Sequence, residues 1–245
     1  MTQLPWPDSA TLCQQIAAET GGKAVLSFSM GKDSIASYIQ MRRHFSEIVP
    51  VYMYLIPGLS FIEEQLAYYE GVMGTHIYRM PLPALYRMWN ASVYQAPDNL
   101  RVILESRLWE FDHDDVLDVV RAKLGWDRTV LSGTVVRAVD SPQRWSAMKT
   151  YGPINRKRGV FYPVYDWRKD QLIEEIRSSG IRLSADYGLF GRSFDGIDYR
   201  FLRHVADAYP DDYRRILECF PLAEMVLKRM EYRDAYFARK GQTHD

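Results

Sequence analysis

The stretch from Ala24 to Ser34, with the sequence AVLSFSMGKDS, is expected to decide the fold. It begins with a short apolar run, continues through small and polar residues, and leads into an amphipathic segment from Ile35 to Phe45. This succession predicts a strand, a loop and a helix. The first backbone N–H groups of a helix, together with loop amides, form a pocket for phosphate. The stretch therefore predicts a phosphate-binding site.

Length and composition are those of an ordinary globular protein. The chain has 245 residues, of which 47% are apolar and 25% charged, so it is long enough for one large domain or a domain with an extension. No apolar run reaches the roughly 18 residues of a membrane span, and the polar start lacks a signal-peptide pattern. We expect a cytoplasmic protein with no membrane partner. Lys plus Arg equals Asp plus Glu at 31 each, which gives no support for broad nucleic-acid binding.

Strand and helix patterns alternate over the first two thirds of the chain. This alternation predicts an α/β fold with an open, mostly parallel five-stranded sheet, helices on both faces and a C-terminal helical region. We expect a sheet domain over residues 1–180 and a helical extension over 181–245 that packs on it. Residues 85–108 are expected to be an insertion at the sheet edge. The five strands are expected at residues 24–28, 48–55, 75–80, 128–132 and 160–164.

The residue types in the loop suit a phosphate. Gly31 permits close backbone approach, Lys32 supplies a cation, and Ser29 and Ser34 supply hydroxyl groups. Asp33 stands where a helix N-cap or a metal-binding carboxylate would lie. The spacing differs from that of the GxxxxGK[ST] loop. A solvated turn is the alternative.

The segment FSMGKDS resembles the SGGKDS signature of the N-type ATP pyrophosphatases, the PP-loop or adenine nucleotide α-hydrolase superfamily. Within it, the segment looks most like the phosphoadenylyl-sulfate (PAPS) reductase family. Met30 stands where the first glycine usually does, and a positive φ there would strain a methionine, so we expect a slightly different loop geometry. The resemblance implies that ATP contacts Ser27, Ser29, Met30, Gly31, Lys32, Asp33 and Ser34.

Three further segments are similar to the same family. Residues 57–64 resemble the segment after its second strand, which implies that Tyr54 and Leu55 contact adenine, with core packing as the alternative. Residues 132–144 resemble GxRxxESxxR. There Gly133 would let the backbone approach the nucleotide, and Arg137 and Arg144 would bind oxyanions unless they are merely solvated.

The third segment, residues 161–167, resembles P[IL]xDW. We expect Asp166 to cap a helix and Trp167 to pack. The glycine-rich run at 188–196 is expected to be a lid, an acceptor-binding loop or a connector. The histidines at 76, 113 and 204 lack metal-ligand spacing, and the acidic residues around His113 favour a helix start.

The resemblance implies a reaction at the α-phosphorus of ATP. An acceptor oxygen would attack, AMP would be transferred and pyrophosphate would leave into the loop. Lys32, Asp33, Arg137 and Arg144 would be catalytic, and Mg²⁺ would be held at Asp33. The preferred function is adenylation for sulfur incorporation, as in the ATP pyrophosphatase components of DNA phosphorothioation systems.

In that function the acceptor would be a DNA backbone phosphate, and a cysteine desulfurase would supply sulfur. The basic residues 156–158 would meet the nucleic acid, unless they form a solvated loop. A second copy of the chain is another candidate partner. Two alternatives remain: tRNA or small-molecule thiolation or amidation by the same chemistry, and a non-catalytic ATP-binding module.

Reductase activity is not expected. The chain has only two cysteines, Cys13 and Cys219, with no paired-cysteine motif and no C-terminal Cys-Gly-Leu-His-type segment. A four-cysteine iron–sulfur cluster within the chain is therefore excluded, and both thiols are expected to be reduced and packed.

Overall fold

The computed structural model of the protein describes residues 4–184 and 196–240. The chain forms two compact units. The first contains residues 1–53, 65–80 and 111–193, and the second contains residues 54–64, 81–110 and 194–245. This arrangement differs from the single division expected at residue 180, because two earlier segments belong to the second unit.

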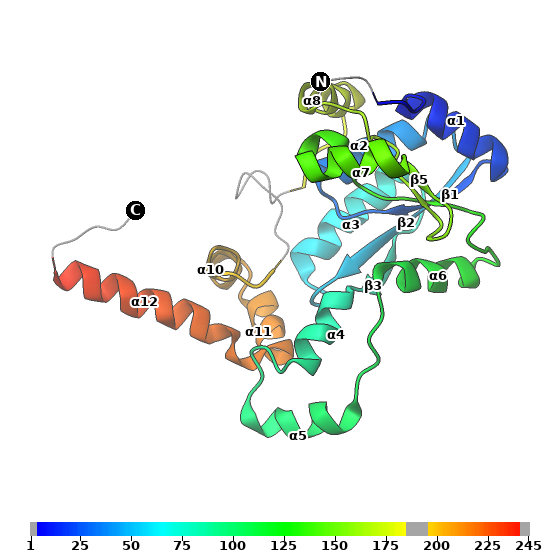
Figure 1. The fold of residues 1–245 in the computed structure, drawn as a ribbon. Helices are drawn as coiled ribbons and strands as arrows, with labels where there is room; N and C mark the ends of the chain where they lie inside the picture. Colours follow the sequence, from blue (N-terminus) through cyan, green and yellow to red (C-terminus); the bar gives the residue numbers. More distant parts are fainter. Residues whose placement is uncertain (1–3, 185–195, 241–245) are drawn as a thin grey trace. The chain divides into compact units, whose positions relative to one another are not determined.

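The strands form one six-stranded sheet in the order β3-β2-β1-β4-β6-β5 (Figure 1). β1 is parallel to β2 and to β4, and β4 is parallel to β6. β5 is antiparallel to β6 and forms an edge. The α/β class and the mostly parallel sheet are confirmed, but the expected number of five strands is wrong because β5 is added. The strands are β1 Lys23–Ser27, β2 Glu47–Tyr54, β3 Tyr78–Pro81, β4 Ser132–Gly133, β5 Ile154–Asn155 and β6 Val160–Phe161.

Helices cover both faces of the sheet in the first unit. Val25 of β1 and Val49 of β2 are in register, and both belong to a buried cluster with Val116 of helix α6 (His113–Lys123). Gly133 of β4 pairs with the residue after Val25 and therefore faces the other side. There a Cβ on Gly133 would lie 2.6 Å from the sulfur of Met41 in helix α2 (Lys32–Met41). α2 and α6 thus lie on opposite faces.

The remaining helices of this unit follow local capping signals. Asp8 accepts from the Thr11 N–H group at the start of α1. Asp112 and Asp115 form a capping box at the start of α6, which confirms the helix start expected around His113. The further helices are α1 Ser9–Glu19, α7 Pro142–Tyr151, α8 Lys169–Ser179, the 3₁₀ turn η1 Ala138–Asp140, and α3 Ser60–Met73, which is divided between the units after residue 64.

Two local predictions in this unit are wrong. The strand expected at 128–132 begins only at Ser132, because the Asp127 side chain accepts from Thr129 N and holds a turn. Asp166 does not cap α8, whose N-cap is Arg168. Asp166 instead accepts from the backbone N–H and hydroxyl groups of Ser9 at the start of α1. Trp167 is buried, as expected.

The second unit is helical. Its helices are α4 Pro83–Asn90, α5 Pro97–Ser106, α10 Tyr199–Ala208, α11 Pro210–Cys219 and α12 Glu224–Arg239, with the 3₁₀ turn η2 Pro221–Ala223. This confirms the C-terminal helical region, whereas the segment 85–108 forms α5 and most of α4. The run at 188–196 lies outside the described residues except for Gly196. The buried core of the unit contains Ile56, Leu59, Phe61, Leu85, Leu202, Val205, Ile216, Phe220, Ala223 and Leu227.

A buried carboxylate in this unit caps the start of α3. Asp212 of α11 is 3% exposed, and it accepts from the backbone N–H groups of Ser60 and Phe61 and from the Ser60 hydroxyl. These N–H groups belong to the first turn of α3 and have no intrahelical partner. A residue 152 positions after Ser60 therefore supplies the cap that the sequence around Ser60 does not.

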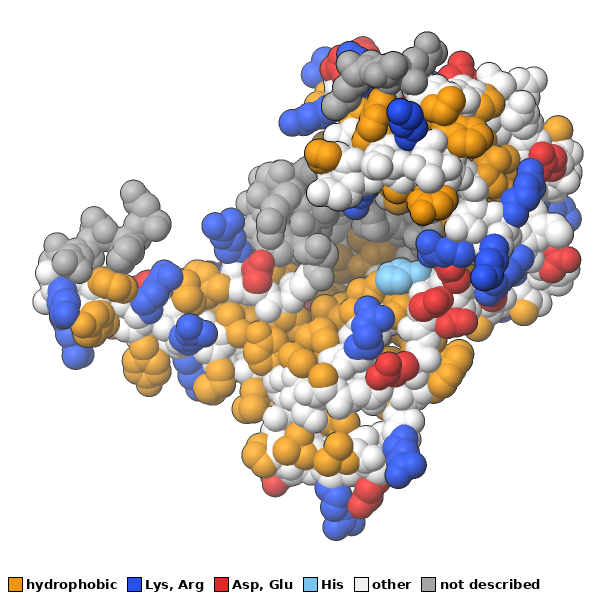
Figure 2. Space-filling view, in the orientation of Figure 1, with side chains coloured by type: hydrophobic (Ala, Val, Ile, Leu, Met, Phe, Trp, Pro, Cys, Tyr) orange, Lys and Arg blue, Asp and Glu red, His pale blue; other side chains and the backbone are white. Residues whose placement is uncertain are grey.

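The surface of the second unit includes exposed apolar side chains. Figure 2 shows hydrophobic side chains along α12, where Tyr232 and Tyr236 are 76% and 53% exposed. α5 has no buried residue, and its Val102 and Leu104 are each 66% exposed. None of the helices in the described ranges is long and apolar enough to cross a membrane.

The guanidinium of Arg121 connects α6 to the sheet. Its side chain is buried and donates to the Val130 carbonyl at 2.9 Å, and to the Ser132 hydroxyl and the Gly159 carbonyl at 2.6 Å each. It also pairs with Asp118 at 2.7 Å. Burial lowers the pKa of Arg121 from its ordinary value. The interaction joins one helix to the starts of β4 and β6.

We expect Arg121→Met to lower the free energy of unfolding by about 3–5 kcal/mol, because two buried carbonyl groups and one hydroxyl lose their donor. Urea unfolding followed by circular dichroism measures this change. Arg128→Met is the matched control: Arg128 also pairs with Asp118, but its side chain is 48% exposed. We expect a much smaller loss for the control, because solvent screens an exposed ion pair. Equal losses in the two variants would contradict this account.

Candidate functional site

The predicted strand, loop and helix are present at residues 23–41. β1 ends at Ser27, and α2 begins at Lys32. Between them, Phe28 is buried and its N–H group donates to the Val51 carbonyl of β2 at 2.8 Å. The loop therefore leaves the carboxyl end of a central strand and enters directly the N-terminus of a buried helix.

Met30 adopts the left-handed backbone conformation that favours glycine. Its φ is 60°, and the residue is only 3% exposed. The methionine thus adopts a positive φ, the conformation that we expected it to avoid. Left-handed backbone costs a non-glycine residue about 1–2 kcal/mol. Burial of a methionine side chain contributes about 1.5–3 kcal/mol, which offsets that strain.

Two serines of the loop have different surroundings. Ser34 is 1% exposed, and its hydroxyl donates to the Gly31 carbonyl at 2.8 Å. Ser29 is exposed, and its hydroxyl lies 3.4 Å from that of Ser34. Gly31 is the N-cap of α2 and makes no side-chain capping bond. The N–H groups at the start of α2 are thus not capped by the preceding residue, as is common where a helix binds an anion.

A series of ion pairs, called here the charge chain, joins this loop to the segment after β4. Lys32 Nζ lies 2.6 Å from Asp33 Oδ2, and Asp33 Oδ1 lies 3.0 Å from Arg137 Nε. Arg137 and Arg144 both pair with Asp140, at 2.7 and 2.8 Å. Three cations alternate with two carboxylates, so the charge chain carries one net positive charge. All four residues predicted to be catalytic belong to it.

Asp140 is the member of the charge chain that the sequence analysis did not select. It lies three residues after Arg137 and four before Arg144. This spacing is the signal that could have identified it, because residues three and four apart meet on a helical turn. Asp140 ends the turn η1, and the next residue, Ser141, caps α7 by accepting from Arg144 N at 3.1 Å.

Arg137 is a buried cation whose hydrogen-bonding groups are incompletely used. It is 5% exposed, and Nη2 donates to Asp140. Within the part of the chain that the structure describes, Nε and Nη1 of Arg137 and Oδ1 of Asp33 are buried and make no hydrogen bond. Nε and Oδ1 lie within ion-pair distance, but are not aligned for a hydrogen bond. Buried polar groups without partners are costly, and they mark a place for a ligand or ordered water.

The charge chain lies where the direction of the sheet reverses. β1 and β4 are neighbours; the strand that follows β1 is added on one side, and the strands that follow β4 are added on the other. The loop after β1 holds Lys32 and Asp33, and the segment after β4 holds Arg137. In open α/β sheets, ligands bind outside the carboxyl ends of strands at such a switch point.

Gly133 has a packing role in the structure. A Cβ at this position would lie 2.6 Å from the Met41 sulfur and 3.0 Å from a ring carbon of Pro163. The space beside Gly133 is thus already filled by the protein on that side. Close approach to a nucleotide, the role that the resemblance implies, stays a prediction.

The predicted adenine contacts belong to the second unit. Tyr54 and Leu55 are partly buried against the core of that unit. Burial raises the pKa of the Tyr54 hydroxyl, and Tyr86 raises it further. The structure thus shows the packing alternative for both residues, and a contact with adenine remains a prediction. Ser27 is the last residue of β1 and pairs with Val51.

Two of the three cations at 156–158 are already paired with acidic residues. Arg158 donates to both oxygens of Asp114, at 2.6 and 2.9 Å. Arg156 pairs with Glu19 at 2.8 Å, but remains 61% exposed. The basic cluster is therefore partly neutralised within the first unit, and Arg156 is the more accessible of its two arginines.

Burial raises the pKa of both thiols, although Cys219 is only partly buried. Cys13 and Cys219 are both free, and Cys13 is fully buried. Burial raises the pKa of the Cys13 thiol to about 12, which disfavours the nucleophilic thiolate. Among the described residues, no group of three or more His, Cys, Asp or Glu side chains is placed to hold a metal ion.

Comparison with known proteins does not identify the chain. No protein-family model matches it, and no curated protein matches it.

The strain at Met30 predicts an unusual order of stability. Met30→Ala loses the buried side chain and keeps the left-handed strain, whereas Met30→Gly loses the side chain and relieves the strain. We expect the glycine variant to be more stable than the alanine variant by about 1 kcal/mol, although both are less stable than the unmodified protein. Urea midpoints measure this difference. An alanine variant as stable as the glycine variant, or more so, would show that Met30 is not strained.

The packing at Gly133 predicts a loss of stability on substitution. We expect Gly133→Ala to cost about 1–3 kcal/mol through crowding against Met41 and Pro163. The control is Gly71→Ala, because Gly71 is exposed in α3 and a Cβ there meets no atom within 4 Å. The control should gain up to about 1 kcal/mol. If Gly133→Ala keeps full stability in thermal unfolding and weakens only ATP binding, the packing role is wrong.

Proposed function

We propose that the protein is an ATP pyrophosphatase that transfers AMP to an acceptor and releases pyrophosphate. The observation that carries this proposal is the charge chain at the switch point of the sheet. It places the N-terminus of α2, Lys32 and the buried guanidinium of Arg137 at the junction of β1 and β4. An anion as highly charged as a triphosphate is the ligand that suits such a place.

Each part of the charge chain has a role in this reaction. The N–H groups of the first turn of α2 and Lys32 stabilise charge on the departing pyrophosphate. Arg137 is permanently charged, and its buried Nη1 has no hydrogen-bond partner among the described residues, so it is available to a phosphate oxygen. Asp140 pairs with both Arg137 and Arg144, and it thereby orients the two guanidinium groups. Catalysis by this set consists of positioning and electrostatic stabilisation.

Asp33 is the residue that would hold Mg²⁺. Its Oδ1 atom is buried and makes no hydrogen bond, and Mg²⁺ in nucleotide sites commonly uses one or two carboxylates together with phosphate oxygens. When bound, the ion would neutralise part of the negative charge of the phosphates. Lys32, which pairs with Asp33 Oδ2 at 2.6 Å, would then turn toward the phosphates.

The acceptor follows from the resemblance to the PAPS reductase-like ATP pyrophosphatases. On that basis a DNA backbone phosphate is adenylated during sulfur incorporation, and a cysteine desulfurase supplies the sulfur. A homodimer is part of the same proposal. The tRNA or small-molecule thiolation alternative uses the same charge chain, and a non-catalytic module would bind ATP through it without turnover.

The test is pyrophosphate release from ATP and Mg²⁺ in the presence of DNA, tRNA or small-molecule acceptors. We expect Lys32→Ala and Arg137→Lys each to lower the rate by about 100-fold or more, as loss of one stabilising donor does elsewhere. Arg177→Ala is the control, because Arg177 lies on α8 with its side chain 76% exposed. Far-ultraviolet circular dichroism checks that all variants are folded.

Three outcomes would contradict the proposal. Unchanged rates in both charge-chain variants would remove these residues from the mechanism. Binding of ATP without pyrophosphate release with any acceptor would favour the non-catalytic module. Pyrophosphate release that depends on tRNA but not on DNA would show that tRNA is the acceptor instead of DNA, with the same chemistry.

A further inference from the structure

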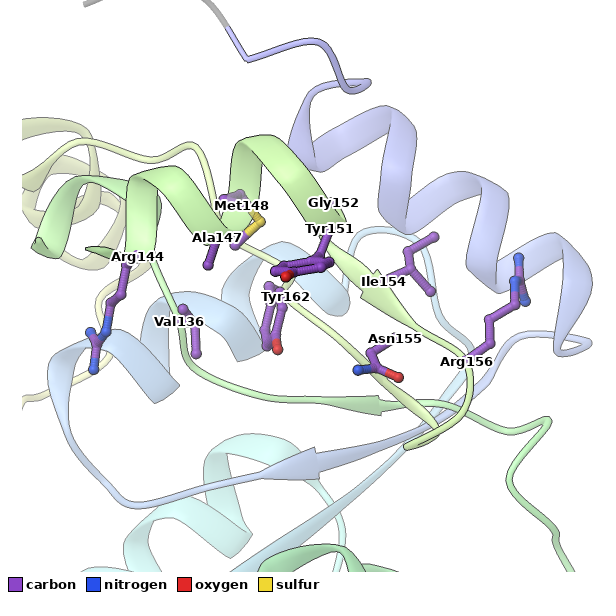
Figure 3. A pocket seen from close by; sticks show the side chains of 10 residues that line it. All are labelled: Val136, Arg144, Ala147, Met148, Tyr151, Gly152, Ile154, Asn155, Arg156 and Tyr162. Atoms are coloured by element: carbon purple, nitrogen blue, oxygen red, sulfur yellow. The ribbon is translucent and has the colours of Figure 1, made fainter. Parts of the chain in front are cut away.

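A groove of about 410 Å³ lies beside the charge chain in the first unit. α7, the edge strand β5 and the segments after β4 and β6 supply its walls (Figure 3). Val136, Ala147 and Ile154 are among the apolar residues that line it. No part of the proposed ATP chemistry uses this space except Arg144, which lines it.

Two tyrosines give the groove aromatic surface. Tyr151 ends α7 and is 79% exposed, and Tyr162 follows β6. In Figure 3 both rings lie between Arg144 on one side and Arg156 on the other. A solvent-accessible tyrosine ring presents a face on which a planar base can stack, whatever the base.

The polar groups of the groove suit a nucleotide. Arg144 and Arg156 have half or more of their side chains exposed, at 50% and 61%, so each keeps donors for a phosphate beside its carboxylate partner. Asn155 uses Oδ1 to accept from Arg158 N at 3.1 Å. Its amide nitrogen carries two donors that can meet the edge of a base.

The groove is joined to the proposed reaction site through Arg144. This residue lines the groove and pairs with Asp140, which also pairs with Arg137. A phosphate bound at the Arg144 end would therefore lie next to the part of the charge chain that holds the buried guanidinium. If the proposed function holds, a groove with aromatic and apolar lining next to the charge chain is suited to the acceptor.

We infer that this groove binds a single-stranded nucleic acid, with one base against Tyr151 and Tyr162 and the adjoining phosphates at Arg144 and Arg156. A single strand is favoured over a duplex because its bases are unstacked and can present a face to an aromatic side chain. That the bound strand is the acceptor for AMP rests on the proposed function.

The experiment measures fluorescence anisotropy of a labelled oligothymidylate with the full chain. A non-hydrolysable ATP analogue is present at saturation. It occupies the loop between β1 and α2, so that the phosphates of the strand do not bind there. We expect Tyr151→Ala to weaken binding about 10-fold, and Tyr151→Phe, which keeps the ring, to change it by less than about twofold. Arg156→Gln should reduce the magnitude of the slope of log affinity against log salt concentration by about one, because binding then releases about one counterion fewer.

Tyr232→Ala is the matched control, because Tyr232 is exposed to a similar extent but lies on α12. Several results would overturn the inference: absence of oligonucleotide binding, equal affinities for Tyr151→Ala and Tyr232→Ala, or Tyr151-dependent binding of thymidine monophosphate as tight as that of the strand. A duplex that binds as tightly with the same dependence on Tyr151 would also overturn it.

Pyrophosphate release separates this inference from the proposed function. Pyrophosphate release without Tyr151-dependent binding of the strand would contradict the role of the groove but support the proposed enzymatic activity. Tyr151-dependent binding without release under any condition would support the groove and remove the adenylation chemistry.

Discussion

The buried guanidinium of Arg121 is the interaction on which the first unit depends. β4 and β6 are each only two residues long, so their own backbone hydrogen bonds hold them weakly. Arg121 donates to groups at the start of both strands and to a carboxylate of its own helix. One side chain thus fixes the position of β4, and the segment that carries Arg137 continues directly from that strand.

The site combines backbone strain with incomplete hydrogen bonding of buried charged groups. Met30 adopts a backbone conformation suited to glycine. Arg137 is buried, and no described residue accepts a hydrogen bond from its Nε or Nη1. Both features cost stability, and such features persist only where the surrounding structure determines them. The apolar side chain of Met30 and the two carboxylates of the charge chain provide that support. Backbone strain and unsatisfied hydrogen-bonding groups at one place are typical of a binding site.

The sequence predicts best those features that depend on local patterns. The loop after β1, the helix start around His113 and the C-terminal helices follow from neighbouring residues, and they are present. Features that depend on distant partners were missed. Asp166 binds Ser9 rather than capping its own helix, Asp212 caps α3 from far along the chain, and β5 forms by antiparallel pairing of two residues. For the site, the family resemblance selects Arg137 and Arg144, but only the fold shows that Asp140 joins them.

The capping of α3 by Asp212 limits how the protein can be divided. A fragment that ends near residue 180 contains the whole of α3 but lacks the carboxylate that binds its first two N–H groups. It also leaves Ile56, Leu59 and Phe61 without the helices that cover them. The part of this protein that contains the sheet is therefore not a transferable module in the genetic sense. Recombination that exchanged the C-terminal segment would have to exchange these earlier residues with it.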